Sequence, residues 1–255
     1  MGDFDKSRKI AFLPGTSGIG KALAKNLAKA GYKILIGGAK LGEAKASVKE
    51  IQKAAGSACP FVEAMDMKGA AGAAKVIFFS MSGSQEEKKD LLQDLQSELK
   101  GKTIIDVTTA AYLKDESKWG QTSTTHMNQE ALAVPAKWVR CWNTVFVGLL
   151  ENPPPSDSPH NIIICGDDQN AVTDAKQLTD CLPGFKALYG GGLKYAKALD
   201  LLGPGWIVEL DKNASIELLD LWVATQNVCN FDRHQLLPTS LVLRLHLRQR
   251  LGSPI

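Results

Sequence analysis

A glycine-containing turn near the start of the chain has the residue types and spacing of a phosphate-binding loop. An apolar run from Lys9 to Leu13 leads into Gly15-Thr16-Ser17-Gly18-Ile19-Gly20, and helical spacing begins at Gly18. A strand that runs through glycines into a helix places backbone N–H groups and the helix N-terminus around a pyrophosphate. The usual spacing is G-x-G-x-x-G, and here Ser17 stands at the second glycine position. The turn therefore predicts a dinucleotide site formed by Gly15, Thr16, Ser17, Gly18, Ile19 and Gly20.

The end of the second expected strand indicates which dinucleotide is bound. Domains that bind NAD usually carry an acid there, which binds the ribose 2′-hydroxyl. This chain has Gly37-Gly38-Ala39-Lys40 instead, with one cation and no acid. Lys40 would attract a 2′-phosphate that a carboxylate would repel. We therefore predict NADP as the cofactor.

A similar turn occurs in the short-chain dehydrogenases, but two features of this chain disagree with that family. Pro14 stands where the family has the first glycine of its fingerprint. The catalytic pair Tyr-x-x-x-Lys is also missing, because Tyr195 and Lys197 have the wrong spacing. We therefore reject that relationship.

Strand and helix signals alternate along the first three quarters of the chain. The apolar runs predict strands at 9–13, 32–36, 60–64, 75–80, 102–107, 138–142 and 161–165. The helical patterns lie at 18–30, 41–55, 85–99 and 169–182. Apolar strands alternating with helices imply an α/β fold, a doubly wound parallel sheet of the Rossmann type.

The domain organisation follows from a change of pattern after Tyr189. Residues 1–189 are expected to form the NADP-binding Rossmann domain. Residues 190–255 are expected to form a small helical extension, with helices at 193–202 and 206–228, and a basic tail packed on the same domain. Leu241 to Arg248 alternates leucine with basic residues, so this segment could cover a sheet edge, pair with a second subunit or contact an anionic surface.

Composition narrows the function classes. A net charge of +3 gives no reason to expect nucleic acid as a partner. Five widely spaced cysteines without a CxxC pair favour neither a disulfide framework nor a metal site. No apolar run reaches the roughly 18 residues of a membrane helix, and the N-terminus has no signal-peptide core. We expect a cytoplasmic protein without a membrane span.

Several polar residues have a structural interpretation beside a functional one. Asp106 inside the fifth strand could orient the loop at Thr108 or satisfy structural hydrogen bonds. Asp167 and Asp168 precede a helix, which predicts N-capping. His126 and His160 lie in polar segments and are expected at the surface.

An ordered set of segments resembles the deazaflavin (coenzyme F420 type)-dependent NADP reductases, and with them the cytosolic reductase domain of the six-transmembrane metalloreductases. The set covers roughly residues 8 to 205, and its order rather than any one piece is specific. The matching segments are KIAFLPGTSGIGKALAKNLAKAGYKILIGG, VIFFSM, KTIIDVTT, VRCWNTV and IICGDD. This family commonly has Ser-Arg where the chain has Gly38-Ala39, which leaves more of the 2′-phosphate contact to Lys40.

The resemblance implies hydride transfer between NADPH and a flavin-like acceptor such as FMN, FAD or a deazaflavin. It places Thr16, Ser17 and Ile19 on the pyrophosphate and Gly38 and Lys40 beside the 2′-phosphate. Residues that the resemblance places on the adenosine and ribose side are Ser80, Met81 and Ser82. Those that it places near the nicotinamide are Thr108, Thr109, Asn143 and Thr144. No catalytic residue is assigned, because a hydride passing between two stacked rings needs orientation more than a proton relay.

Three functions therefore stay open at this point. The first is an NADPH-dependent oxidoreductase with a small-molecule electron acceptor. Such a protein could also form a homodimer. The second is an imine or 2-hydroxyacid reductase of related architecture. The third is an NADP-binding sensor or regulatory protein without catalysis, which the altered positions Ser17 and Ala39 would allow.

Overall fold

The computed structural model describes residues 4–56, 61–109 and 121–201. The chain divides into two units, Met1–Ile216 and Glu217–Ile255, and every described residue belongs to the first. The predicted helix at 206–228 and the alternating segment at 241–248 lie outside the described residues. No helix within the described ranges is long and apolar enough to cross a membrane.

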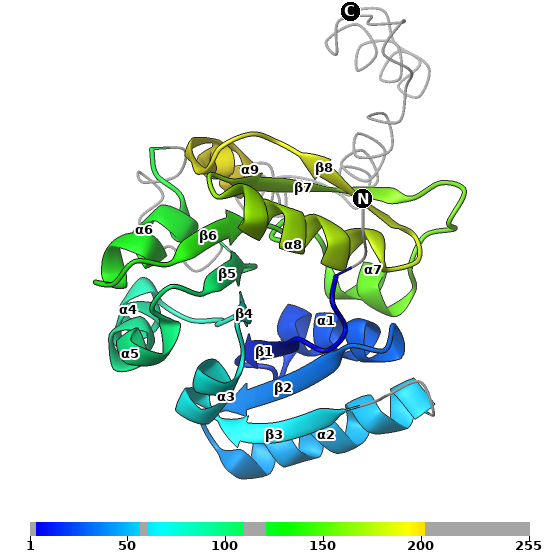
Figure 1. The fold of residues 1–255 in the computed structure, drawn as a ribbon. Coiled ribbons are helices and arrows are strands. Elements are labelled where there is room, and N and C mark those ends of the chain that lie inside the picture. Colours follow the sequence, from blue (N-terminus) through cyan, green and yellow to red (C-terminus); the bar gives the residue numbers. More distant parts are fainter. Residues whose placement is uncertain (1–3, 57–60, 110–120, 202–255) are drawn as a thin grey trace, which may run out of the picture. The chain divides into compact units, whose positions relative to one another are not determined.

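One eight-stranded sheet organises the described residues, in the order β3-β2-β1-β4-β5-β6-β7-β8 (Figure 1). All neighbouring pairs are parallel except β6 and β7, which are antiparallel. The strand order reverses between β1 and β4, which is the switch point where such folds bind ligands. The strands are β1 Lys9–Leu13, β2 Lys33–Gly38, β3 Val62–Asp66, β4 Val76–Phe79, β5 Thr103–Asp106, β6 Lys137–Arg140, β7 His160–Gly166 and β8 Phe185–Tyr189.

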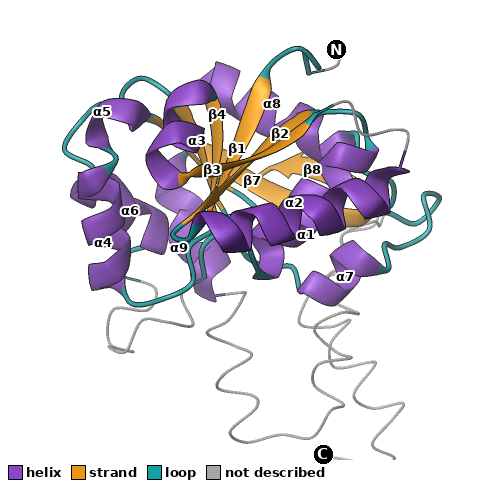
Figure 2. Cartoon of the chain, turned by 90° about the horizontal axis from the view of Figure 1, so that it is seen from below, coloured by secondary structure: helices purple, strands orange, loops and turns teal. Residues whose placement is uncertain are grey.

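Helices cover both faces of the sheet (Figure 2). The helices are α1 Gly18–Lys29, α2 Leu41–Ala55, α3 Met67–Ala73, α4 Gln85–Asp94, α5 Gln96–Leu99, α6 Thr124–Ala131, α7 Val147–Glu151, α8 Gln169–Asp180, the short η4 Leu193–Tyr195 and α9 Ala196–Asp200. Helices α1, α2, α7 and α8 pack on one face, and α3, α4, α5 and the segment from η4 into α9 pack on the other.

The sheet has a separate hydrophobic core on each face, and successive side chains along a strand belong to the two cores in turn. Phe12 belongs to the core under α1 and α2, and it stacks on Phe78 of β4 with ring centroids 4.7 Å apart. The next residue, Leu13, belongs to the core under α3 and α4. Since successive strand side chains point to opposite faces, the continuous apolar runs of the sequence are what a sheet buried on both faces requires.

Most expected elements are confirmed, and two have the expected bounds, β1 and α2. The single helix expected over 85–99 is interrupted at Leu95, which ends α4 and precedes α5. The sheet is also not wholly parallel, because β7 runs against β6. Elements that the sequence patterns did not reveal are α3, α6, α7 and β8.

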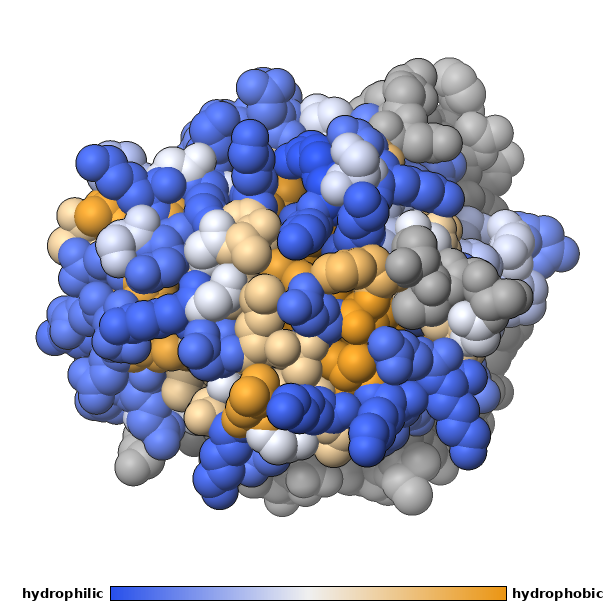
Figure 3. Space-filling model, turned by 60° about the horizontal axis from the view of Figure 1, so that its bottom comes forward, coloured by the Kyte–Doolittle hydropathy of each residue, from blue (hydrophilic) through white to orange (hydrophobic). Residues whose placement is uncertain are grey.

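The chain after Tyr189 begins an extension that packs on the Rossmann core. Leu193 and Ala196 are buried in the core on the α3 side, and Asp200 is only 4% exposed. On the face shown in Figure 3, hydrophilic side chains cover most of the surface and a strip of apolar side chains crosses the middle. A few hydrophilic side chains lie within this strip.

Candidate functional site

The turn between β1 and α1 shows which position needs glycine. Gly18 has φ +54°, and an added Cβ there would meet no atom within 4 Å. Ser17 precedes it in an extended conformation, with φ −155° and ψ 173°. Because the left-handed conformation lies at Gly18, a serine at position 17 introduces no backbone strain. Both residues are exposed, so this side of the turn is open.

Gly20 is required for a different reason, which is close packing. A Cβ at this position would lie 2.8 Å from the carbonyl oxygen of Pro14 and would overlap the side chain of Ser80. Ser80, directly after β4, donates a hydrogen bond of 2.7 Å from Oγ to that same Pro14 oxygen. Gly20 and Ser80 therefore hold the turn after β1 against the loop after β4.

The N-terminus of α1 is available to an anion. No described side chain caps this helix, and Ser17 at its N-cap makes no capping hydrogen bond. The N–H of Gly15 is already used, because it donates to the carbonyl of Gly37 at 3.0 Å. The N–H groups of the first turn of a helix lack intrahelical acceptors and carry a partial positive charge. This geometry fits a pyrophosphate above Thr16, Ser17 and Ile19.

The end of β2 lies beside the turn after β1. A Cβ at Gly38 would lie 3.2 Å from Thr16 Cγ2, a contact so tight that a side chain here would require its neighbours to shift by a few tenths of an ångström. Ser47 of α2 adds a hydrogen bond of 3.3 Å to the carbonyl of Thr16. Lys40 follows at the N-cap of α2, with its side chain 80% exposed and its Nζ 3.6 Å from Glu43. Such an exposed ion pair contributes little to stability, so Lys40 can leave Glu43 to contact a ligand phosphate.

The loop after β4 contains the three residues expected on the adenosine and ribose side. Ser80 is buried and holds the turn, Met81 is half-buried and Ser82 is exposed. Ser84 then caps α4 by accepting a hydrogen bond from the N–H of Glu87, whose carboxylate accepts in return from the N–H of Ser84. This capping box fixes where the loop ends.

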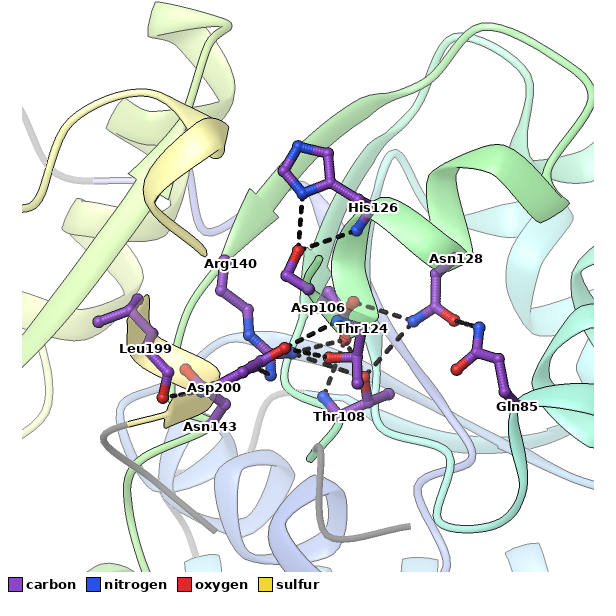
Figure 4. A network of polar contacts seen from close by, with 11 residues as sticks. Gln85, Asp106, Thr108, Thr124, His126, Asn128, Arg140, Asn143, Leu199 and Asp200 are labelled. Carbon is purple, nitrogen blue, oxygen red and sulfur yellow. Dashed lines mark hydrogen bonds and ion pairs between the residues drawn. The ribbon is translucent and has the colours of Figure 1, made fainter. Parts of the chain in front are cut away.

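On the side where the nicotinamide is expected, Asp106 organises the loop after β5 (Figure 4). One oxygen, Oδ1, accepts hydrogen bonds from the N–H and Oγ1 of Thr108, at 2.8 and 2.6 Å. The other, Oδ2, accepts from Nδ2 of Asn128 in α6 at 3.0 Å. Asp106 is fully buried and Thr108 is 3% exposed, whereas Thr109 is half-buried. Asp106 therefore both orients the Thr108 loop and serves a structural role, the two alternatives that the sequence left open.

Arg140 links this loop to the end of the described chain. Its guanidinium is fully buried, with Nη1 3.3 Å from Asp106 and Nη2 in an ion pair with Asp200 of α9. Asp200 also accepts from the N–H and Oγ1 of Thr124, at 2.7 and 3.1 Å. Arg140, Thr124, Asn128 and Asp200 are not among the residues that the sequence patterns predict at the site. The available signal was Arg140, a cation that ends the apolar strand before Cys141 and Trp142.

A second buried cation lies near this network. Lys88 of α4 is 1% exposed, and burial lowers the pKa of its ammonium, while the nearby carboxylates of Asp106 and Asp200 oppose that shift. Two cations and two carboxylates thus lie below the loops where the nicotinamide is expected. Their opposite charges balance, as charges buried at this depth require.

Asn143 is held in a defined orientation by α9. Its Nδ2 donates to the carbonyl of Leu199 at 3.0 Å and to Asp200 Oδ1 at 3.3 Å. Since a carbonyl can only accept, the amide nitrogen must face α9, and Oδ1 has no hydrogen-bond partner among the described residues. Thr144 beside it is 9% exposed. The preceding Trp142 has φ +63°, an uncommon conformation for a bulky residue, and its buried indole packs edge-on against Phe185.

The candidate residues thus gather at one edge of the sheet. They follow β1, β2, β4, β5 and β6, which are mutually parallel and therefore end at the same edge. The close approaches at Gly38 and Gly20 and the uncapped α1 fit a dinucleotide lying along this edge, as does Asn143 Oδ1, for which the described part of the chain provides no donor.

Other polar residues lie away from this edge or have structural partners. Asp168 caps α8 as predicted, with its Oδ1 accepting from the N–H of Ala171 at 2.9 Å. Asp167 instead accepts from the N–H of Leu193, so it does not cap α8. His160 was expected at the surface but is 4% exposed at the start of β7, and burial lowers the pKa of its ring. Burial also raises the pKa of Cys165 to about 11.

Comparison with known proteins agrees with this arrangement. Residues 9–110 match the family model for NADP oxidoreductases that depend on coenzyme F420. The chain is 30% identical over 207 residues to the F420-dependent NADP reductase of Methanocaldococcus jannaschii, covering 77% of this chain and 89% of that protein.

Two solved structures share the fold. A protein of Arthrobacter sp. FB24, named as a candidate F420-dependent NADP reductase, superposes with a TM-score of 0.63 at 21% identity, covering 80% of this chain and 94% of its own. An imine reductase of Bacillus cereus superposes with a TM-score of 0.54 at 13% identity, covering 96% of this chain and 78% of its own. Identities this low show the fold alone.

Proposed function

Because the chain belongs to the family of coenzyme F420-dependent NADP oxidoreductases, we propose that it transfers a hydride between NADP(H) and a deazaflavin of the F420 type. The observation that carries this proposal is the 30% identity to a reductase of that name over 89% of its length. The convergence of the loops after β1, β2, β4, β5 and β6 at one edge supports it.

The pyrophosphate end is bound mainly by backbone. The first turn of α1 presents N–H groups, and Gly18 lets the chain approach without a side chain in the way. Lys40 beside Gly38 supplies positive charge for the 2′-phosphate, and Glu43 is the carboxylate that it would exchange for that phosphate.

The reacting end is oriented by side chains that are themselves held in place. Asp106 fixes Thr108, and Asp200 with the Leu199 carbonyl fixes Asn143. Asn143 Oδ1 would then be the acceptor for the amide N–H of a bound nicotinamide carboxamide. When bound, NADPH supplies the hydride and the deazaflavin ring accepts it. The protein contributes orientation and exclusion of water, for which buried, mutually bonded side chains are suited.

Single-turnover oxidation of NADPH tests this function. Protein preloaded with NADPH is mixed with an F420-type deazaflavin, FMN, FAD or a ferric chelate, and the loss of NADPH absorbance is followed. We expect oxidation that is fastest with the deazaflavin. NADPH binding without oxidation by any acceptor would instead identify a nucleotide-binding sensor, and faster oxidation by FMN or FAD would assign a flavin acceptor.

A further inference from the structure

A polar cavity lies at the edge of the sheet opposite the candidate cofactor site. Its volume is about 580 Å³, which lies in the range of small-molecule sites. Lys75 and Lys102 directly precede β4 and β5, and Lys137 opens β6, so the cavity lies where these parallel strands begin. The lining residues are Arg8, Lys75, Lys100, Gly101, Lys102, Thr103, Lys137, Asn170, Thr173 and Asp174. The five residues of β1 alone separate the two edges by roughly 16 Å.

The charge of this cavity is strongly unbalanced. Five cationic side chains line it, against the single carboxylate of Asp174. Asp174 is already bound by both terminal nitrogens of Arg8, at 2.7 Å each. Lys137 pairs with Asp168 at 3.2 Å. The described carboxylates therefore neutralise only two of the five cations.

The remaining three cations have little or no negative charge paired with them among the described residues. Lys102 donates to the carbonyl oxygens at the C-terminal end of α3, which carry only a partial negative charge. Burial lowers the pKa of Lys102, and the carboxylate of Glu98 opposes that shift without forming an ion pair with Lys102 among the described residues. The described residues provide no ion pair for Lys75 or Lys100. A multiply charged anion would supply the missing negative charge.

The other lining residues indicate the kind of anion. None of the described residues that line the cavity is aromatic or a large aliphatic, so these residues offer no stacking surface for a base or ring. Asn170 and Thr173 of α8 add an amide and a hydroxyl. We propose that this cavity is a second binding site, distinct from the cofactor site, for a small hydrophilic polyanion of the di- or polyphosphate class.

Pyrophosphate is the probe for this proposal, and the protein is first saturated with NADP⁺ so that the cofactor site is filled. Isothermal titration should then show pyrophosphate binding that weakens as salt is raised. The double variant Lys75→Gln, Lys100→Gln should weaken this binding about tenfold. The matched control is Lys25→Gln, Lys53→Gln, which removes the same charge from α1 and α2 and should change it less than about twofold.

The outcomes separate this site from the proposed function. Absence of pyrophosphate binding to the NADP⁺-saturated protein would overturn the second site, as would equal losses in the two double variants. NADPH affinity measured on the same variants reports on the cofactor site alone, and we expect the Lys75, Lys100 variant to leave it unchanged.

Discussion

Asp106 and Arg140 occupy the same register position of two neighbouring parallel strands, and the carboxylate Oδ1 lies 3.3 Å from Nη1 of the guanidinium. Both residues are fully shielded from solvent. Each ends its strand at the edge where the candidate cofactor site lies. The pair therefore couples the Thr108 loop to the Asn143 loop through the sheet itself.

Removing the cation from this network is expected to destabilise the protein strongly. Arg140→Met leaves the buried carboxylates of Asp106 and Asp200 without their guanidinium partner, which should lower the free energy of unfolding by about 3–5 kcal/mol. Arg140→Lys keeps the charge but cannot contact both carboxylates in the same geometry, so its loss should be smaller. Urea denaturation followed by circular dichroism measures both. Equal stability of Arg140→Met and wild type would show that the buried pairs do not stabilise the fold.

Asn143 is predicted to accept a hydrogen bond from the carboxamide of the cofactor. The wild-type protein should bind NADP⁺ about tenfold more tightly than its 3-acetylpyridine analogue, which lacks the amide N–H donors that Oδ1 would accept. Asn143→Ala should reduce this preference to near unity. Competition against bound NADPH, monitored by fluorescence, measures both affinities. An unchanged preference in Asn143→Ala would place the carboxamide elsewhere.

Lys40 is predicted to select the phosphorylated cofactor. Lys40→Ala should weaken NADPH binding about threefold to tenfold and leave NADH binding nearly unchanged, since only NADPH carries the 2′-phosphate. Fluorescence titration at two salt concentrations provides the measurement, and the effect should shrink at high salt. Lys45→Ala, an exposed lysine of the same helix, is the control. Equal weakening of both nucleotides would contradict the assignment of Lys40.

The phosphate turn should respond differently at two of its positions. Gly20→Ala should weaken NADPH binding by tenfold or more, because its Cβ would displace Ser80 and the Pro14 carbonyl. Ser17→Gly should alter the affinity less than about twofold, because position 17 is extended and needs no glycine. The same fluorescence titration measures both. A large gain from Ser17→Gly would mean that the serine obstructs the phosphates.

Acidification should destabilise the protein through His160. Burial lowers the pKa of this ring, so below pH 6.5 the unfolded chain binds a proton that the folded protein binds less readily. Stability that is present at pH 7 is therefore lost as the pH falls below about 6.5, until the folded-state pKa is passed. His160→Phe should flatten this dependence in denaturation curves measured from pH 7.5 to 5. An identical slope in the variant would exclude His160 as its source.

The sequence predicts the local parts of this molecule well. The bounds of β1 and α2 follow from a run of apolar residues and from an amphipathic pattern, both of which lie within one segment. The ends of the strands also place the expected cofactor residues at one edge, because parallel strands must end together. Asp168 as the cap of α8 is likewise a local feature.

The parts that were not predicted depend on contacts between distant segments. The pairing of Asp106 with Arg140 requires the register of β5 against β6, and Asp200 joins them from 60 residues beyond Arg140. The burial of His160 depends on β7 and β8 packing at the sheet edge, and no periodicity within its own polar segment indicates this. The reversed direction of β7 is likewise a property of its pairing with β6, which no pattern within its own residues indicates.

Direct transfer of a labelled hydride is the most immediate test of the proposed reaction. NADPH deuterated at C4 of the nicotinamide, prepared separately for each face of the ring, is mixed with the protein and an F420-type deazaflavin. Mass spectrometry then measures deuterium in the reduced deazaflavin. We predict that deuterium from one face, and not from the other, appears there in equal amount to the NADPH oxidised. A deazaflavin that is not reduced, or is reduced without deuterium from either face, would contradict the account.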